Sequence, residues 1–521
     1  MSKKKEQAMQ AAVYDARKLG KAKMGVLGLQ HMFAMFGATV LVPILTGLSV
    51  STTLLFAGVG TLLFHLLTRG KVPAFLGSSF AFLAGYFAIA PGGDPSLLPY
   101  ACLGVACAGC LYLILSALFA GFGAKRVMRF FPPVVTGPIV ICIGLILCSS
   151  AVTNCQVNWL VAVIAVIIIV LCNIWGKGMI KILPILLGVA ITYIICLLLT
   201  MGADITPIAN GDGTFTDFYC LGGKEGLQLF SVGALQGIKD AAWIGIPFTW
   251  DQTVFSIFGS GFDSGLAITA IITIVPLALA TMIEHIGDIS AISSTCGRNF
   301  IAHPGLHRTL LGDGLATILA SLFGAPANTT YGENTGVLAL TRVFDPRVIR
   351  IAACFAILLS FCPKFAAVIT AMPTAVVGGI SLVLYGMISA VGVRNLIENH
   401  VDFTKSRNII VAALILTLSL GINYTGAIAF ACGNITISLS GLAVGSIVGI
   451  ILNAIFPGKD YDFDDSVEMG WVHEAEQAEA AAEAAEQAVE AGVESAVGAA
   501  AEVAEEAEEV IADSAPDKPV S

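Results

Sequence analysis

The residues best suited by type and spacing to bind a ligand lie between positions 329 and 342, in the sequence Thr-Thr-Tyr-Gly-Glu-Asn-Thr-Gly-Val-Leu-Ala-Leu-Thr-Arg. Glu333 follows a glycine and precedes an apolar run that is too short to cross a bilayer as a full helix. An ionisable side chain and an interrupted backbone are both costly inside a membrane, where no water satisfies them. In so apolar a chain, the combination favours a binding site over a structural segment.

A second group of ionisable residues lies in the apolar stretch 265–293. Glu284 and Asp288 are four residues apart, so on a helix they share one face. Two carboxylates this close in a low-dielectric site resist ionising together, and they can share one proton. The alternative is that Asp288 only accepts a hydrogen bond from the backbone or from His31. His31 follows Gln30 in the first apolar stretch, where a lone histidine favours a structural role over bracing of the Glu284 region.

Composition defines the class of protein. The 521 residues are 56% hydrophobic and 12% charged, and the mean hydropathy is +0.86. Soluble domains carry about 25% charged residues, so the chain is predicted to be an all-α, polytopic membrane protein. The net charge of −9 misleads, because residues 459–521 hold 19 acidic and 2 basic residues. The preceding body is basic, as suits short loops beside anionic lipid headgroups.

The hydrophobic pattern predicts about fourteen membrane spans. They are placed at 25–48, 51–69, 72–90, 99–123, 134–152, 159–176, 182–203, 265–293, 310–324, 326–341, 349–372, 374–393, 406–422 and 439–457. With the N-terminus in the cytoplasm, 22 of the 25 basic residues of the body fall on the cytoplasmic side. One span more or fewer would reverse the later loops and destroy this asymmetry. Both termini are therefore predicted to be cytoplasmic, in a multi-pass protein of the cytoplasmic (inner) membrane.

The predicted organisation has five parts: a basic N-terminus (1–24), seven spans (25–203), an external connection (204–264), seven spans (265–457) and an acidic Ala/Glu-rich tail (458–521). Seven spans in each half place the halves in opposite orientations, so a repeat between them is inverted. The third and tenth spans are both short, polar and interrupted by glycine, with Leu-Gly-Ser-Ser-Phe-Ala-Phe at 76–82. The tail has high helix propensity but little to bury, which favours a solvated extension.

Two interrupted spans predict a polar chamber at the centre of the membrane. Backbone N–H groups at Ser78–Phe80 and Tyr331–Glu333 would point from helix starts into this chamber. Glu284 and Glu333 would accept hydrogen bonds from ligand N–H groups. A flat ring with both carbonyl and N–H groups meets these demands, and uracil does so without net charge.

The residues 331–342 resemble the signature of the nucleobase–ascorbate transporters, the nucleobase:cation symporter-2 family. The core of that signature corresponds to Asn334, Gly336 and Thr341, followed here by Arg342. Residues 29–43, 76–82 and 284–288 are similar to the same family in the same order. The resemblance covers about residues 25–457 and is most specific to the bacterial uracil permeases. Relatives that transport purines typically have Gln where this chain has Glu333.

The resemblance implies roles for individual residues. Glu284 and Glu333 correspond to the substrate-binding carboxylates, and the N–H groups of Phe80 and Gly332 to the donors that meet the uracil carbonyls. Tyr331 and Tyr385 are similar to residues that line or support the pocket. The family fold has a core domain and a gate domain, the latter formed by spans 5–7 and 12–14. Members are proton symporters and are often dimeric.

One departure from the family concerns the proton. Asp288 stands where some close relatives have a histidine linked to proton coupling, so Asp288 with Glu284, and with His31 nearby, becomes the candidate for that role. Two alternatives to uracil symport stay open: a purine (xanthine or urate) permease, and an anion transporter of the same seven-plus-seven architecture. Nothing resembles a phosphate-binding loop for ATP, so ATP-driven transport is not expected. No cofactor, metal or nucleic-acid partner is expected, and the membrane spans exclude a soluble enzyme.

Overall fold

A computed structural model describes residues 12–209, 214–258, 261–432 and 435–458, which belong to one compact unit, Ala11–Asp465. The predicted acidic tail lies outside the described residues except for its first position. The predicted basic N-terminus is described from residue 12 onward.

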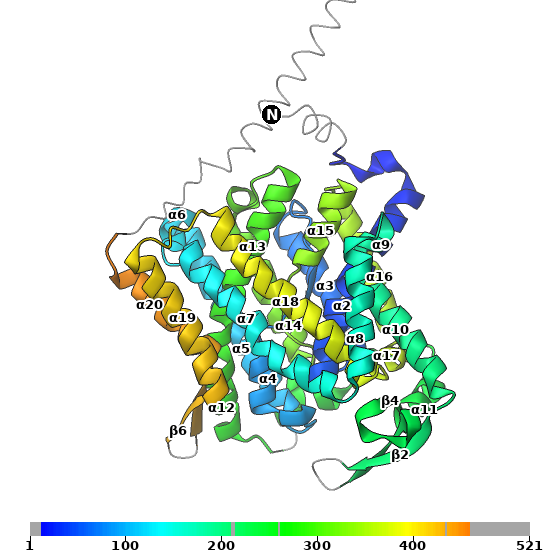
Figure 1. Ribbon diagram of the computed structural model, residues 1–521. Helices are drawn as coiled ribbons and strands as arrows, with labels where there is room; N and C mark the ends of the chain where they lie inside the picture. The colour runs from blue at the N-terminus through cyan, green and yellow to red at the C-terminus, as the bar shows by residue number, and fades with distance from the viewer. Residues whose placement is uncertain (1–11, 210–213, 259–260, 433–434, 459–521) are drawn as a thin grey trace, which may run out of the picture. The chain divides into compact units, whose positions relative to one another are not determined.

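Helices account for most of the described chain (Figure 1). The longer ones are α2 (Lys21–Thr46), α3 (Val50–Leu67), α5 (Leu98–Phe122), α7 (Pro133–Gln156), α8 (Trp159–Ile174), α10 (Pro184–Thr200), α12 (Ser264–Ile274), α13 (Ala278–Cys296), α14 (Leu306–Leu322), α15 (Gly332–Thr341), α16 (Pro346–Ser360), α18 (Thr374–Glu398), α19 (Ser406–Thr425) and α20 (Gly441–Ile455). The shorter ones are α4 (Leu83–Ile89), α6 (Ala124–Met128), α9 (Met179–Ile182), α11 (Val232–Asp240) and α17 (Pro363–Thr370).

Local sequence explains where many of these helices begin. The side chains of Ser49, Asn158 and Ser440 accept hydrogen bonds from backbone N–H groups in the first turns of α3, α8 and α20, as N-cap residues do. Proline occupies the first position of α7 and α16, where its missing N–H removes no helical hydrogen bond. The apolar pattern therefore decides which stretches are helical, and caps and prolines decide their starts.

Every predicted span overlaps at least one helix of the structure. Among the described residues, seven helical segments are long and apolar enough to cross a membrane, and an eighth is the pair α16–α17, which bends by 88° at its break. The single segment Ser264–Cys296 combines α12 and α13. A multi-pass membrane protein is thus established, while the total of about fourteen spans stays a prediction.

Two short strands, one in the third predicted span and one in the tenth, pair with each other. Strand β1 (Leu76–Ser78) pairs antiparallel with β5 (Asn328–Thr330), with Gly77 opposite Thr329. Proline at positions 73 and 326 favours extended backbone just before each strand. Gly77 is required by close approach, because an added Cβ would meet the Tyr331 ring at 2.5 Å and Thr39 Oγ1 at 2.7 Å. The pair joins segments that are about 250 residues apart in the sequence.

The prediction of an all-α protein is incomplete, because two further β structures are present. Strands β2 (Asp204–Ala209), β3 (Phe215–Cys220) and β4 (Gln228–Ser231) form an antiparallel sheet within the predicted external connection. Strands β6 (Ile428–Cys432) and β7 (Ile435–Leu439) form a hairpin before α20. The sheet lies at the end of the unit opposite α6 (Figure 1).

The long helices pack in two sets. In one set α14 packs against α3 and α5, and α16 packs against α2 and α3. In the other, α18 runs along α7 and also contacts α8, while α19 packs against α7 and α20. Ser389 of α18 donates a hydrogen bond to the Ile141 carbonyl of α7 at 3.0 Å. Gly144 of α7 and Gly392 of α18 allow this contact, since an added Cβ at either would overlap the facing backbone.

The close approach at Gly77 generates a prediction about stability. Gly77→Ala should destabilise the purified protein by about 1–3 kcal/mol, because the added methyl group overpacks a site bounded by the Tyr331 ring. Gly25→Ala is the matched control, since an added Cβ at Gly25 meets nothing within 4 Å. Thermal unfolding in detergent measures both variants. Equal melting temperatures for the two would contradict the expected overpacking.

Candidate substrate site

The β1–β5 pair organises the backbone donors of the site. The ladder is extended by Ser79 N, which donates to the Ala327 carbonyl at 2.8 Å, and by Tyr331 N, which donates to the Phe75 carbonyl at 3.2 Å. The prediction that these two N–H groups face a ligand is therefore wrong, because they complete the sheet. Helix α4 also begins later than predicted, at Leu83, after a turn in which Leu83 N donates to the Phe80 carbonyl.

Two predicted donors stay available. Within the described part of the chain, the N–H groups of Phe80 and Gly332 donate to no protein acceptor. Gly332 is the first residue of α15, which has no side-chain N-cap, so its N–H group lies at the positive end of that helix dipole. Phe80 directly follows the extended end of β1. These are the two groups that the family resemblance assigned to substrate carbonyls.

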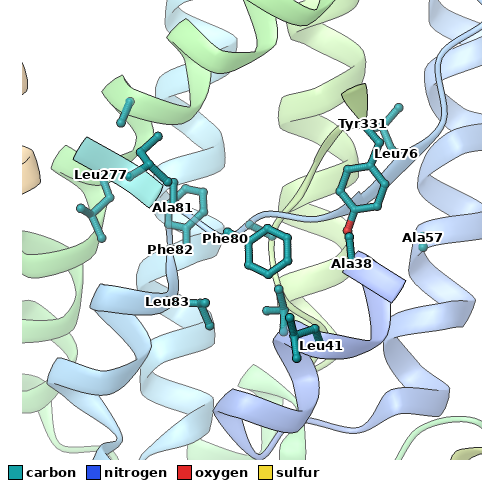
Figure 2. Packing of buried hydrophobic residues seen from close by; sticks show 14 of the residues in the cluster. Ala38, Leu41, Ala57, Leu76, Phe80, Ala81, Phe82, Leu83, Leu277 and Tyr331 are labelled. Carbon is teal, nitrogen blue, oxygen red and sulfur yellow. The ribbon is translucent and has the colours of Figure 1, made fainter. Parts of the chain in front are cut away.

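Tyr331 braces the junction rather than presenting its hydroxyl to a ligand. Its side chain is 4% exposed, and its hydroxyl donates to the Ser78 carbonyl at 2.9 Å. Thr39 Oγ1 of α2 lies 3.3 Å from the same hydroxyl, and Ser78 Oγ donates to the Thr39 carbonyl at 3.0 Å. Figure 2 shows the Tyr331 ring directed with its hydroxyl toward the part of α2 that carries Ala38.

Phe80 and Tyr385 meet across the two helix sets. Their ring centroids are 5.7 Å apart and the planes make an angle of 80°, an edge-to-face arrangement. The Phe80 side chain is buried among apolar residues that include Leu41 of α2 (Figure 2). Tyr385 belongs to α18 and is 1% exposed. The structure thus brings together two predicted site residues that are 305 positions apart in the sequence.

Helix α13 carries the acidic residues Glu284 and Asp288, and Asp288 reaches this junction. Glu284 and Asp288 are both half-buried, and Thr330 of β5 donates a hydrogen bond to Asp288 Oδ2 at 2.8 Å. A Cβ built on Gly332 would lie 3.8 Å from Asp288 Oδ1, so Asp288 sits beside the start of α15. Thr330 is thus a hydrogen-bond partner of Asp288 that sequence reasoning did not identify.

Glu333 lies in the first turn of α15. Its side chain is outside the described part of the structure.

His31 contacts the signature motif. It is fully buried in α2, and Asn334 Nδ2 donates to the His31 carbonyl at 3.3 Å and lies 3.4 Å from His31 Nδ1. His31 therefore links α2 to the first turns of α15, a structural role of the kind that its position in the sequence favoured.

The other motif residues shape the end of α15. Thr341 Oγ1 donates to the Val337 carbonyl at 2.9 Å and accepts from Val343 N. Arg342 ends the helix in the left-handed conformation, with φ of 54°. Gly336 is exposed, and an added Cβ there meets nothing within 4 Å.

A buried pair next to the site was missed by sequence reasoning. His285 Nδ1 lies 2.9 Å from Asp313 Oδ2, and both side chains are 0% exposed. The contact joins α13 to α14. Thr330 Oγ1 lies 3.5 Å from the same histidine nitrogen, so Asp313, His285, Thr330 and Asp288 form one polar chain. The available signal was Asp313 itself, an acidic residue between two glycines within the apolar stretch 310–324.

Among the residues described, no group of three or more His, Cys, Asp or Glu side chains could hold a metal ion. The polar groups at the junction are carboxylates, hydroxyls and free N–H groups. Such a set suits a small polar ligand that both donates and accepts hydrogen bonds.

Long apolar helices around half-buried carboxylates and interrupted segments are the features of a membrane transporter. The chain belongs to the Permease family, whose model matches residues 22–428. The resemblance to nucleobase–ascorbate transporters is thereby confirmed, and the protein is a permease and not an enzyme.

Curated relatives match along nearly their whole length. The chain is 37% identical over 442 residues to "Uracil permease" of Bacillus caldolyticus, covering 83% of this chain and 92% of the relative. It is 38% identical over 452 residues to "Probable uracil permease" of Haemophilus influenzae, covering 85% and 96%. The identity to "Uracil permease" of Escherichia coli strain K12 is 36% over 445 residues, covering 82% and 90%.

Solved structures share the fold at low sequence identity. The transmembrane domain of a cyanobacterium bicarbonate transporter, BicA, is 16% identical with a TM-score of 0.54, covering 85% of this chain and 99% of that chain. The overall structure of SLC26A9 is 13% identical with a TM-score of 0.55, covering 85% and 66%.

The buried His285–Asp313 pair generates a prediction about stability. Asp313→Leu should destabilise the protein by about 3–5 kcal/mol, because it leaves a buried histidine without its partner. The double variant His285→Leu/Asp313→Leu should recover much of this loss, since two apolar groups need no partner. Thermal unfolding of both variants in detergent measures the difference. A double variant no more stable than Asp313→Leu would show that the pair is not the source of the cost.

Proposed function

We propose that this protein transports uracil together with protons across the cytoplasmic membrane by alternating access. The observation that carries the proposal is the 36–38% identity to uracil permeases over more than four-fifths of both chains. Glu333 supports uracil over xanthine or urate, because it stands where purine-transporting relatives of the family typically have Gln. The substrate is neutral, so the proton gradient is the proposed driving force, and no cofactor is involved.

In the proposed binding mode, uracil lies between the end of β1 and the start of α15. Its carbonyl oxygens accept hydrogen bonds from the N–H groups of Phe80 and Gly332. Its ring N–H groups donate to Glu284 and Glu333. The N–H groups of Phe80 and Gly332, which donate to no acceptor in the described part of the chain, support this arrangement, since a ligand carbonyl satisfies donors that would otherwise be costly at membrane depth.

The proposed architecture consists of two inverted repeats of seven spans, 25–203 and 265–457, with β1–α4 and β5–α15 as the interrupted third and tenth spans. The antiparallel pairing of β1 with β5 supports this repeat, because inverted copies meet in opposite directions. The two packing sets of helices support a division into a core and a gate, the latter containing α7, α8, α10, α18, α19 and α20. A homodimer and cytoplasmic termini are part of the same proposal.

An anion is the second candidate substrate, since proteins that share this fold include a bicarbonate transporter and the murine anion transporter Slc26a9. Their similarity of 11–16% identity concerns the fold alone. Glu284 and Asp288 stand against an anion, because half-buried carboxylates repel negative charge.

Uptake of radiolabelled uracil into cells tests the proposed function. Wild-type uptake should collapse with a proton uncoupler. Glu333→Gln should lower uptake by about ten- to one-hundred-fold, since a hydrogen bond to a charged group contributes about 1.5–3 kcal/mol. Glu398→Gln is the matched control, because Glu398 is exposed at the end of α18 and, among the residues that the structure describes, pairs only with Arg394 one turn away. Uptake that survives both treatments would exclude the mechanism, and competition with xanthine or bicarbonate would identify the alternatives.

The proton pathway has its own test. We propose that Asp288 and Glu284 share the coupled proton, with Asp288 held in place by Thr330. Asp288→Asn should therefore abolish uracil-driven proton uptake in liposomes while uracil binding persists. Asp240→Asn, on the exposed helix α11, should leave coupling unchanged. Normal proton uptake in Asp288→Asn would show that the pair does not carry the proton.

A further inference from the structure

The segment before α2, residues 12–19, lies along the ends of several site-bearing helices; we call it the N-terminal strap. Its backbone forms a parallel bridge between Val13 and Val343. Val13 N donates to the Arg342 carbonyl, and Phe344 N donates to the Val13 carbonyl, both at 2.8 Å. Arg342 is the residue that ends α15, so the strap is hydrogen-bonded to the connection that leaves the signature helix.

Tyr14 joins the strap to α13. Its hydroxyl donates to the carbonyl of Cys296, the last residue of that helix, at 2.9 Å. The Arg298 guanidinium lies 4.3 Å from the centre of the Tyr14 ring, and the ring of Phe344 lies 5.5 Å away. The last carbonyls of a helix lack helical partners, so this bond satisfies a group that α13 alone cannot. One side chain thus contacts the end of α13 and the α15–α16 connection together.

Charged groups hold the next part of the strap. Asp15 pairs with Arg347 of α16 at 2.9 Å and with Arg17 of the strap itself. Asp345, the N-cap of α16, accepts a hydrogen bond from Ala16 N at 2.7 Å and pairs with Arg347. The Arg17 hydrogen bond, with Arg347 nearby, lowers the pKa of Asp15 to about 2. The attraction between the Asp15 carboxylate and the two arginines is therefore fully present above the ordinary pKa of an aspartate, and it is lost only as pH falls through about 2.

Apolar contacts complete the attachment to α2. Ala16 is fully buried in a small cluster with Leu27 of α2, Val343 and Val348. Val13, Leu19 and Met24 pack against this cluster. Because the strap continues directly into α2, its contacts connect α2, α13, α15 and α16 at one end of the unit.

We infer that the N-terminal strap positions the substrate site by holding the ends of α13, α15 and α2 in fixed register. These three helices carry the acidic residues Glu284 and Asp288, the start of the signature motif, and His31. Each of these residues lies within a few helical turns of a strap contact, on the same helix as that contact. Tyr14 and Asp15 are therefore positioning residues that touch no substrate. The inference rests on the proposed function for its effect on uracil affinity, but its effect on the helices is independent of the substrate.

Two measurements on the full-length protein test the inference: hydrogen exchange in lipid nanodiscs and uracil uptake into cells. Hydrogen exchange should show that Tyr14→Ala raises the exchange rate of amides in the last turn of α13 by about ten-fold, as expected for loss of a hydrogen bond and a cation–π contact. Uracil uptake should show a KM raised by roughly three- to ten-fold with a smaller change in maximal rate. Tyr14→Phe, which keeps the ring contacts, should lie between Tyr14→Ala and the wild type.

The charged contact provides a second pair of variants. Asp15→Asn should raise the KM for uracil and the amide exchange rate, as Tyr14→Ala does, and Asp15→Glu should bring both back toward the wild-type values. Lys18→Gln is the control, since Lys18 is exposed on the same strap and its side chain makes no hydrogen bond or ion pair within the described part of the chain. Folded variants with wild-type exchange and KM would overturn the inference. If the wild type takes up no uracil, the proposed function fails, while the exchange rates still decide the role of the strap. If Tyr14→Ala does not fold, the milder Tyr14→Phe and Asp15→Asn decide it.

Discussion

The constraint on which the structure depends is that backbone N–H and C=O groups inside a membrane protein need partners within the protein. Two segments of this chain leave the helical pattern among apolar helices, and each would by itself expose unpaired backbone groups. The pairing of β1 with β5 satisfies both at once. Three hydrogen bonds then connect this ladder to neighbouring helices. Leu76 N donates to Thr61 Oγ1, and Thr317 Oγ1 donates to the Asn328 carbonyl. Asn328 Nδ2 donates to the Phe56 carbonyl. What the ladder leaves unpaired, at Phe80 and Gly332, is then informative about a ligand.

The predictable features were those written locally in the sequence. Apolar stretches of sufficient length identify helices, and Pro, Gly and polar residues at 73–82 and 326–334 indicate where helices are interrupted. The polar partners depend on tertiary structure. His285 of α13 contacts Asp313 of α14, and Thr330 of β5 donates a hydrogen bond to Asp288 of α13, so each pair joins two different elements. The strap pairs Val13 with Val343, and nothing in a basic N-terminal segment indicates such a partner. The β6–β7 hairpin could have been predicted, because Gly-Asn at 433–434 is a dipeptide typical of two-residue turns and the β-branched residues Ile435, Thr436 and Ile437 follow it.

The polar groups of the site are distributed so that no helix carries the whole function. The acidic residues lie on α13, the motif on α15, the buried histidine on α2 and the aromatic Tyr385 on α18. The hydrogen bond from Asn334 to the His31 carbonyl joins α15 to α2, and α13 packs against α15. Rigid positioning of the carboxylates therefore depends on several elements together.

The contact between Phe80 and Tyr385 is of a different kind. It joins the short segment after β1 to α18, in the other helix set, through ring edges and faces without a directional hydrogen bond. An aromatic pair contributes about 0.5–1.5 kcal/mol beyond its buried area, which is close to thermal energy. In the proposed alternating-access cycle, such a contact excludes water when closed and separates without leaving an unpaired polar group on either side. In that proposed cycle the ring contact acts as a seal that opens without breaking a directional bond, whereas a hydrogen bond in the same place would have to be broken each time the two helix sets separate.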